Sequence, residues 1–160
     1  LMGTGLVDLG KNGTAKMQRK IYLIGSLRNP WVPILSNQLR DLGYDVFDDW
    51  FAAGEFADDA WRDYERGRGH NLKQALEGHA ANHVFDFDKY HLDQSDMGIL
   101  LLPAGKSGHL ELGYLIGRGC ESYIVYTEEP ERFDVMYLLA DRVFNSIPDI
   151  LEHLEEQEDE

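Results

Sequence analysis

Cysteine and long hydrophobic runs are scarce in this sequence, and each shortage excludes a class of protein. Cys120 is the single cysteine among 160 residues, so an internal disulfide is impossible, and the chain fits a reducing cytoplasm. Every apolar run is far shorter than the roughly 20 residues that a membrane-spanning helix needs. The sequence therefore predicts a cytoplasmic protein with no membrane partner.

Positive charge is also scarce. The chain has 15 Lys and Arg against 29 Asp and Glu, which gives a formal net charge of −14. Binding to a long nucleic acid relies on Lys and Arg side chains that neutralise phosphates, so a nucleic-acid polymer is not an expected partner. One small phosphorylated ligand, held by a few local donors, remains compatible with this charge.

The remaining composition is that of an ordinary globular domain. Hydrophobic residues make up 43% and charged residues 28%, and the length suffices for one domain with a real core. Residues 1–19 begin with a Gly-rich stretch that lacks the features of a signal peptide, and we expect a disordered leader or a tag there. The domain itself is expected to span 20–154, and residues 155–160 to form an acidic tail.

Short apolar runs alternate with helical patterns along the chain. Strands are predicted at Lys20–Gly25, Tyr44–Phe47, Met97–Leu102, Ser122–Tyr126 and Arg142–Asn145. Helical segments are predicted at 33–42, at 59–81 as two helices or one broken helix, at 85–95, at 108–118, at 134–140 as a turn, and after a capping Ser146.

This alternation predicts a single-domain, doubly wound, five-stranded parallel sheet, flavodoxin-like or Rossmann-like, with helices on both faces. Ligands of such sheets bind outside the carboxyl ends of the strands. That rule selects three loops, Ser26–Asn29, Asp48–Glu55 and Pro103–His109.

A charged residue interrupts the apolar pattern of GKSGHLELGYLIGRG (105–119). Glu111 stands between Leu110 and Leu112, in the expected first turn of a helix at the ligand edge. A helix N-terminus favours negative charge by about 0.3–1 kcal/mol, which would keep Glu111 ionised. An ionised carboxylate there can act as a nucleophile or stabilise charge. The alternative is that Glu111 only caps its own helix.

The loop GSLRN, 25–29, follows the first predicted strand directly. Gly25 permits a tight turn, Ser26 offers a hydroxyl, and Arg28 offers a guanidinium that matches phosphate geometry. Backbone N–H groups before the next helix would complete an anion site. The alternative is an ordinary turn with a surface arginine.

Other polar and aromatic residues near these loops leave two interpretations open. The stretch DFDKYHLDQSD (86–96) holds four aspartates, which form a solvated face or supply one carboxylate to the pocket. His79 and His83 have a spacing that suits a metal, but no clear third ligand accompanies them, so we predict no metal site. The aromatic side chains between 47 and 56, Trp50 among them, either stack on a planar base or pack in the core.

Taken together, IYLIGSLRN (21–29), SDMGILLLP (95–103) and GHLELGYLIGRG (108–119) resemble the nucleoside 2-deoxyribosyltransferase superfamily from Lys20 to about Leu154. The resemblance includes the branch that hydrolyses 2′-deoxynucleoside 5′-monophosphates. It implies that Glu111 is the nucleophile that attacks the anomeric carbon. It also implies a pocket aspartate eight residues before Asp96, which is Asp88, with Asp86 as the fallback.

The same resemblance implies the substrate contacts. Its monophosphate branch holds the phosphate with the first loop, here Ser26, Leu27 and Arg28, and Ser107 or Gly108 would be a second contact. The full set of predicted substrate-binding residues is Gly25, Ser26, Leu27, Arg28, Asp48, Trp50, Ser107, Gly108 and His109. True transferases carry a further aspartate before the glutamate, whereas this chain has PAGKSGH (103–109), which favours a phosphate.

The expected partner is a small nucleoside or nucleotide, with no cofactor and no metal, in a homodimer or larger homo-oligomer. Tyr114 and the turn 134–140 are candidate intersubunit contacts. Two other functions are compatible with the same residues. One is an NAD-cleaving enzyme of the TIR type, which also uses a pocket glutamate, and the other is a nucleotide-binding sensor without turnover.

Overall fold

A computed structural model describes the backbone of residues 19–159 and the side chains of residues 19–157. It contains one sheet with the strands β1 (Lys20–Ile24), β2 (Asp45–Phe47), β3 (Met97–Leu102), β4 (Glu121–Tyr126) and β5 (Arg142–Phe144). The strand order is β2-β1-β3-β4-β5 and all neighbouring pairs are parallel, which confirms the predicted sheet. The expected leader, 1–19, lies outside the described residues except for Arg19.

The strand order also locates the ligand edge. From β1 the chain moves to β2 on one side, and it then returns to β3 on the other side of β1. The loops after β1 and β3 therefore leave the sheet in opposite directions, and the crevice between them is where such folds bind ligands. The loop that carries Arg28 and the loop that leads into the helix of His109 both start at this point.

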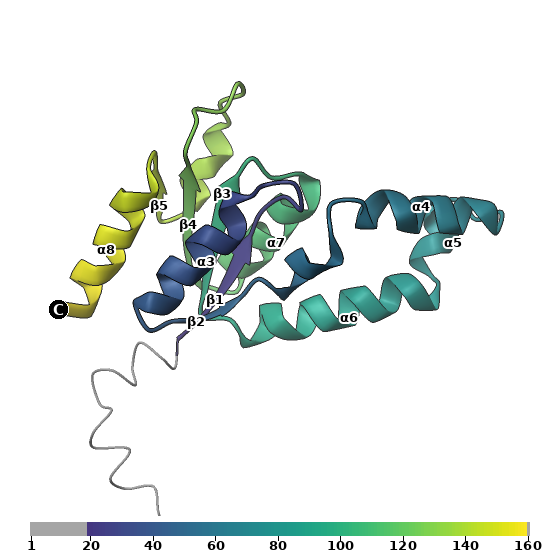
Figure 1. Ribbon diagram of the computed structural model, residues 1–160, viewed down its shortest axis with the longest axis horizontal. Helices are drawn as coiled ribbons and strands as arrows, with labels where there is room; N and C mark the ends of the chain where they lie inside the picture. Colours follow the sequence, from purple (N-terminus) through teal and green to yellow (C-terminus); the bar gives the residue numbers. More distant parts are fainter. Residues whose placement is uncertain (1–18, 160) are drawn as a thin grey trace, which may run out of the picture.

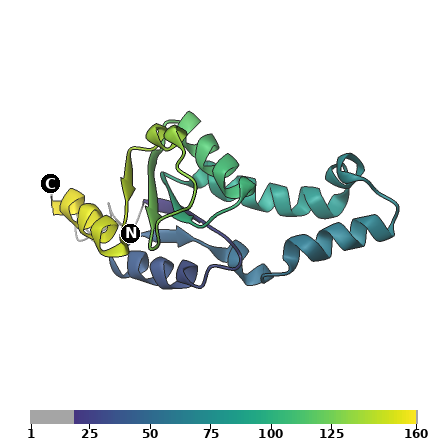
Figure 2. The same cartoon turned by 90° about the horizontal axis from the view of Figure 1, so that it is seen from above.

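Helices cover both faces of the sheet: α3 (Trp31–Asp41), α6 (His79–Gln94), α7 (Lys106–Gly117) and α8 (Ile147–Asp159). In β1, Ile21 and Leu23 face a core that α3 and α8 complete. Tyr22 and Ile24 face a second core, which α7 and the carboxyl end of α6 complete. Figures 1 and 2 show helices on both faces of the sheet. Because both faces are covered, the central strands read as continuous apolar runs.

The remaining described elements are η1 (Asp49–Ala53), α4 (Ala57–Gly67), α5 (Leu72–Leu76) and η2 (Val135–Leu139). Helices α4, α5 and the first half of α6 form an arm that projects away from the sheet (Figures 1 and 2). The turn between α4 and α5 uses Gly69 at a φ of 81°, and Asn71 and Gln74 close a capping box at the start of α5. No described helix combines the length and the apolar character that crossing a membrane requires.

Helix α6 differs from the prediction. A break was expected between residues 81 and 85, but one helix runs from His79 to Gln94. The segment lacks Gly and Pro, so nothing interrupts the helix once it has begun after Gly78. The Asn82 side chain donates to the Gly78 carbonyl over 2.8 Å and reinforces the first turn. One long helix therefore links the arm to the sheet.

Helix α7 begins at Lys106, two residues earlier than predicted. Gly108 lies inside its first turn and is buried. It packs so closely on the sheet that a Cβ there would lie only 2.9 Å from Ile24 Cγ2. The early start moves Glu111 from the first turn to the second.

The predicted cap of the last helix is confirmed, since Ser146 Oγ accepts a hydrogen bond from the Asp149 N–H over 3.2 Å.

Two glycines of α7 test how closely this helix packs on the sheet. A methyl group at Gly108 would enter the core, where overpacking costs about 1–3 kcal/mol. At Gly113 nothing outside the helix lies within 4 Å of the added Cβ, and Gly→Ala within a helix gains roughly 0.5–1 kcal/mol. In urea unfolding, the free energy of unfolding should be higher for Gly113→Ala than for the wild type. That of Gly108→Ala should be at least about 1 kcal/mol lower than that of Gly113→Ala. Equal stability of the two variants would contradict the close contact.

Candidate active site

Glu111 is joined to the sheet by one hydrogen bond. The Tyr22 hydroxyl, on β1, donates to Glu111 Oε2 over 2.9 Å. Tyr22 is fully buried and Glu111 is half-buried. The bond crosses from α7 to β1, and Glu111 lies beyond the first turn of α7, so its position is not that of a cap for its own helix.

Burial sets the charge of this carboxyl group. The pKa of Glu111 is raised to about 7, chiefly by burial; the Tyr22 hydrogen bond opposes this rise and the negative charge of Asp88 adds to it. The expectation that the helix N-terminus keeps Glu111 ionised is wrong, because the effect of the helix end fades within the first turn. Near neutral pH the group is thus poised between its two protonation states.

Tyr22 remains a hydrogen-bond donor under all ordinary conditions. Burial raises the pKa of Tyr22 far above its usual value, and the charges of Glu111 and Asp88 raise it further. A buried tyrosine hydroxyl needs an acceptor, and Glu111 supplies it.

Asp88 is the aspartate of the 86–96 stretch that lies beside Glu111. It is half-buried, and burial raises its pKa. Asp86 is exposed. The other two aspartates have structural partners, because Asp93 accepts from Lys89 Nζ over 2.7 Å and Asp96 accepts from the Lys20 N–H over 2.8 Å. The structure thus brings together Asp88, Tyr22 and Glu111 from three different elements.

Polar contacts between α6 and α7 hold the two carboxyl groups in register. The Tyr114 hydroxyl donates to Asp93 within the same chain. Arg118 donates to the Leu92 carbonyl over 2.9 Å and to the Asp93 carbonyl over 3.1 Å. Because Asp88 and Glu111 lie one to two turns from these contacts, the spacing between the helices fixes their separation.

The loop after β1 is a closed turn. Ser26 Oγ accepts from the Arg28 N–H over 3.1 Å, and the Ser26 carbonyl accepts from the Asn29 N–H over 3.0 Å. Leu27 is half-buried. At Gly25 a Cβ would lie 3.1 Å from a Val32 methyl group, which explains the glycine. The Arg28 guanidinium is exposed and lies 3.5 Å from Asp59.

Asp48 and Trp50, after β2, both have partners within the fold. Trp50 Nε1 donates to the Leu23 carbonyl over 2.8 Å, and the Trp50 ring lies beside Gly25. Asp48 forms an ion pair with Arg40 at 2.8 Å. The Trp50 bond holds η1 against the end of β1, and the Asp48 ion pair joins this segment to α3. The Trp50 ring also packs against the core, which is one of the two roles considered for it.

The loop after β3 is held by His109. Its Nδ1 hydrogen-bonds the Gly105 carbonyl over 2.8 Å, and its Nε2 hydrogen-bonds the Tyr137 hydroxyl over 2.9 Å. The two rings stack with centroids 5.7 Å apart. Ser107 is exposed in the first turn of α7, whereas Gly108 is buried. His109 therefore ties the start of α7 to η2.

Tyr22 is the site residue that the sequence analysis missed. It stands in the middle of an apolar strand, KIYLI, and was interpreted as part of a buried run. The signal was present, because a tyrosine at a fully buried strand position requires a polar partner for its hydroxyl. The partner is 89 residues away along the chain, so only the fold identifies it.

The histidines at positions 79 and 83 have no third metal ligand beside them among the described residues. His79 and His83 are exposed on α6, and within residues 19–159 no three His, Cys, Asp or Glu gather as a metal site would require.

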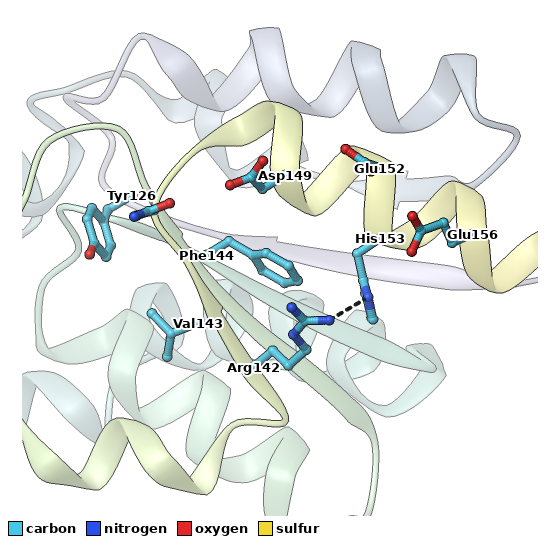
Figure 3. A pocket seen from close by; sticks show the side chains of 9 residues that line it. Tyr126, Arg142, Val143, Phe144, Asp149, Glu152, His153 and Glu156 are labelled. Atoms are coloured by element: carbon cyan, nitrogen blue, oxygen red, sulfur yellow. Dashed lines mark hydrogen bonds between the residues drawn. The ribbon is translucent and has the colours of Figure 1, made fainter.

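A hollow of about 420 Å³ lies between the ends of β4 and β5 and helix α8 (Figure 3). It contains none of the predicted site residues. Asp149, Glu152 and Glu156 line it, as do Arg142 and His153, which are joined by a hydrogen bond of 3.1 Å. Three carboxylates would repel an anionic ligand, so we place the candidate site at Glu111 instead.

Comparisons with known proteins give structural matches alone. No family profile matches the chain, and no curated protein is significantly similar in sequence. A 2-deoxyribosyltransferase from Bacillus psychrosaccharolyticus aligns with a TM-score of 0.56 and 19% identity, over 82% of this chain and 90% of that one. A conserved protein from Enterococcus faecalis V583 aligns with a TM-score of 0.59 and 18% identity, over 87% and 98%.

A CMP N-glycosidase from Clostridium botulinum aligns with a TM-score of 0.52 and 12% identity, over 86% of this chain and 99% of that one. At these identities the likeness shows a common fold. The chain therefore shares its architecture with a 2-deoxyribosyltransferase and a CMP N-glycosidase.

The raised pKa of Glu111 has a consequence for stability. Its folded-state value of about 7 exceeds the ordinary value of 4.5, so the folded state binds the proton more tightly than the unfolded state. The stability from this group is full below pH 4.5 and is lost as the pH rises towards 7. Glu111→Gln removes the titration, and its stability relative to the wild type should increase by about 2 kcal/mol from pH 5 to pH 8. Urea unfolding of both proteins at the two pH values measures this, and a constant difference would contradict the buried carboxyl group.

Proposed function

We propose that this chain, which shares its fold with a 2-deoxyribosyltransferase and a CMP N-glycosidase, cleaves the N-glycosidic bond of a nucleoside or nucleoside 5′-monophosphate. The single observation that carries the proposal is the geometry of Glu111. Its carboxyl group has a pKa of about 7, accepts a hydrogen bond from a buried tyrosine, and lies beside the second carboxyl group of Asp88.

In the first step the ionised Glu111 carboxylate attacks the anomeric carbon of the sugar. A glycosyl ester forms as the C–N bond breaks, and the base departs with the bonding electron pair. Positive charge develops on the sugar ring in this step, and a carboxylate close to the ring stabilises it. Protonated Asp88 donates its proton to the departing base. Acid catalysis of this kind accelerates a reaction by about 10²–10⁴-fold.

In the second step water or an acceptor base attacks the same carbon and releases Glu111. Asp88, now ionised, takes the proton from the attacking group, as in retaining glycosidases. The two carboxyl groups thus need opposite protonation states at the start, with Glu111 ionised and Asp88 neutral. In the free protein the negative charge of Asp88 raises the pKa of Glu111, so Glu111 holds the proton first, and that proton must move to Asp88 when the substrate binds.

The tight turn after β1 supports a phosphate site. Ser26, Leu27 and Arg28 would hold a 5′-phosphate at this turn, with Ser107 or Gly108 at the start of α7 as a further contact. The Arg28 and Ser107 side chains are accessible, and both loops leave the sheet at the switch point between β1 and β3. Gly25, Asp48, Trp50 and His109 would then border the sugar and the base.

We propose that the chain acts in the cytoplasm as a homodimer or larger homo-oligomer. Large apolar side chains exposed on the arm and on η2 support an association surface; among them are Leu72, Leu76, Phe85, Val135 and Leu138. Light scattering coupled to size-exclusion chromatography should give at least twice the mass of one chain. A single-chain mass at micromolar concentration would contradict the assembly.

The decisive test is a substrate screen with Glu111 variants. The wild type should release free base from nucleosides or 5′-monophosphates, and an acceptor base distinguishes transfer from hydrolysis. Glu111→Ala should reduce turnover by at least about 10³-fold, because it removes the nucleophile, and should retain binding. Chromatography of the released base measures this. Full activity of Glu111→Ala, or release of base from NAD alone, would contradict the proposal.

The pH profile tests the role of Tyr22. Attack requires ionised Glu111, so kcat/KM should rise as the pH increases through about 7. Tyr22→Phe removes the hydrogen bond that favours the ionised form, and the rising limb should move to higher pH. A merely structural role of Tyr22 would lower activity equally at every pH.

A further inference from the structure

Asp59 stands between two arginines at the edge of the candidate site. Arg28 Nη2, in the loop after β1, lies 3.5 Å from Asp59 Oδ2. Arg62 Nη1 lies 3.4 Å from the other oxygen of the same carboxylate, Oδ1. Both distances exceed the roughly 2.7–2.9 Å of a strong charge-assisted hydrogen bond, so the carboxylate fills the space between the guanidinium groups without closing on either.

The topology explains how α4 reaches this loop. Strand β2 lies beside β1, so η1 and α4, which follow β2, leave the sheet next to the loop that follows β1. Asp59 is in the first turn of α4, and Arg62 is one turn further along. The sequence gives no hint of this contact, because 31 to 34 positions separate these residues from Arg28.

The space between the Arg28 and Arg62 guanidinium groups is accessible and positively charged enough to suit an anion. Side chains of Arg28, Asp59 and Arg62 are each about half-exposed or more, so a ligand can reach them. Arg62 also bonds Asp63 through Nε over 3.0 Å, which orients its Nη1 towards Asp59. The Asn29 side chain, 5% exposed, has an amide nitrogen without an acceptor within the described part of the chain, so this loop holds an unused donor.

We propose that Arg62 is a second phosphate-binding residue, and that the 5′-phosphate of the substrate takes the place that the Asp59 carboxylate occupies between Arg28 and Arg62. The inference rests on the proposed function, which assigns Arg28 to the phosphate. Asp59 is then a specificity-determining competitor: a phosphate dianion displaces it, whereas a nucleoside without a phosphate leaves the ion pairs intact.

The geometry favours phosphate over a carboxylate ligand. A phosphate presents three oxygens to two guanidinium forks, whereas Asp59 offers one oxygen to each. In a chain of net charge −14, two arginines at one point are the local compensation that a dianion requires. The arm, which carries Arg62, therefore has a role in substrate choice.

The experiment compares the four common 2′-deoxynucleoside 5′-monophosphates with the four matching nucleosides. Arg62→Ala should reduce the ratio of kcat/KM for monophosphate over nucleoside by about tenfold to hundredfold, chiefly through KM, and Arg62→Lys should restore part of it. Asp59→Asn should change the ratio in the opposite direction, because it removes the competing charge. Lys73→Ala, on α5 of the same arm, is the matched loss of one positive charge and should leave the ratio unchanged.

Calorimetric titration of the same monophosphates into each variant separates this inference from the proposed function. Monophosphate binding that weakens in Arg62→Ala supports the phosphate site even if no base is ever released. Turnover of nucleosides without any monophosphate binding supports the proposed chemistry and overturns the phosphate site. Equal effects of Arg62→Ala and Lys73→Ala also overturn it, as does an Asp59→Asn variant that binds monophosphate more weakly than the wild type.

Discussion

The hydrogen bond from Tyr22 to Glu111 is the interaction on which the candidate site depends. A buried hydroxyl without an acceptor costs about 1–3 kcal/mol, and a buried carboxylate without a donor costs more. Each group satisfies the other, which explains why a glutamate is tolerated in the apolar segment that packs on the sheet. The bond also defines the orientation of the carboxyl group, because Tyr22 is fixed within the buried strand β1.

The fold brings the other segments of the candidate site close to this hydrogen bond. Because β1 lies between β2 and β3, the loop of Arg28, the start of α7 and the carboxyl half of α6 come to one region. Lys20 bonds His91 over 2.6 Å, and His91 stacks on Phe47 with centroids 3.9 Å apart, so α6 is anchored on the sheet below Asp88. The same long helix continues into the arm. The helix that carries Asp88 is therefore continuous with the arm.

The sequence predicts the fold to a large extent because the evidence is local. Each strand is an apolar run bounded by polar or glycine residues, and the motif after β3 places Glu111 at the ligand edge. The start of α7 was predicted two residues too late, and the close approach of Gly108 to Ile24 joins residues that are distant in the sequence. The pKa of Glu111 depends on burial by the folded chain, and the pairing of Asp59 with two arginines depends on where the arm leaves the sheet. Such contacts join residues that are distant in sequence, and only the fold specifies them.

Intact-protein mass spectrometry during turnover tests the central claim most directly. If Glu111 is a nucleophile with an ionisable carboxylate, acid quenching of a reaction with a slow substrate should trap one glycosyl group on the chain. Peptide mapping should assign this group to Glu111, and Glu111→Gln should remain unlabelled. An unmodified chain that steadily releases free base, or a label on any other residue, would contradict the account.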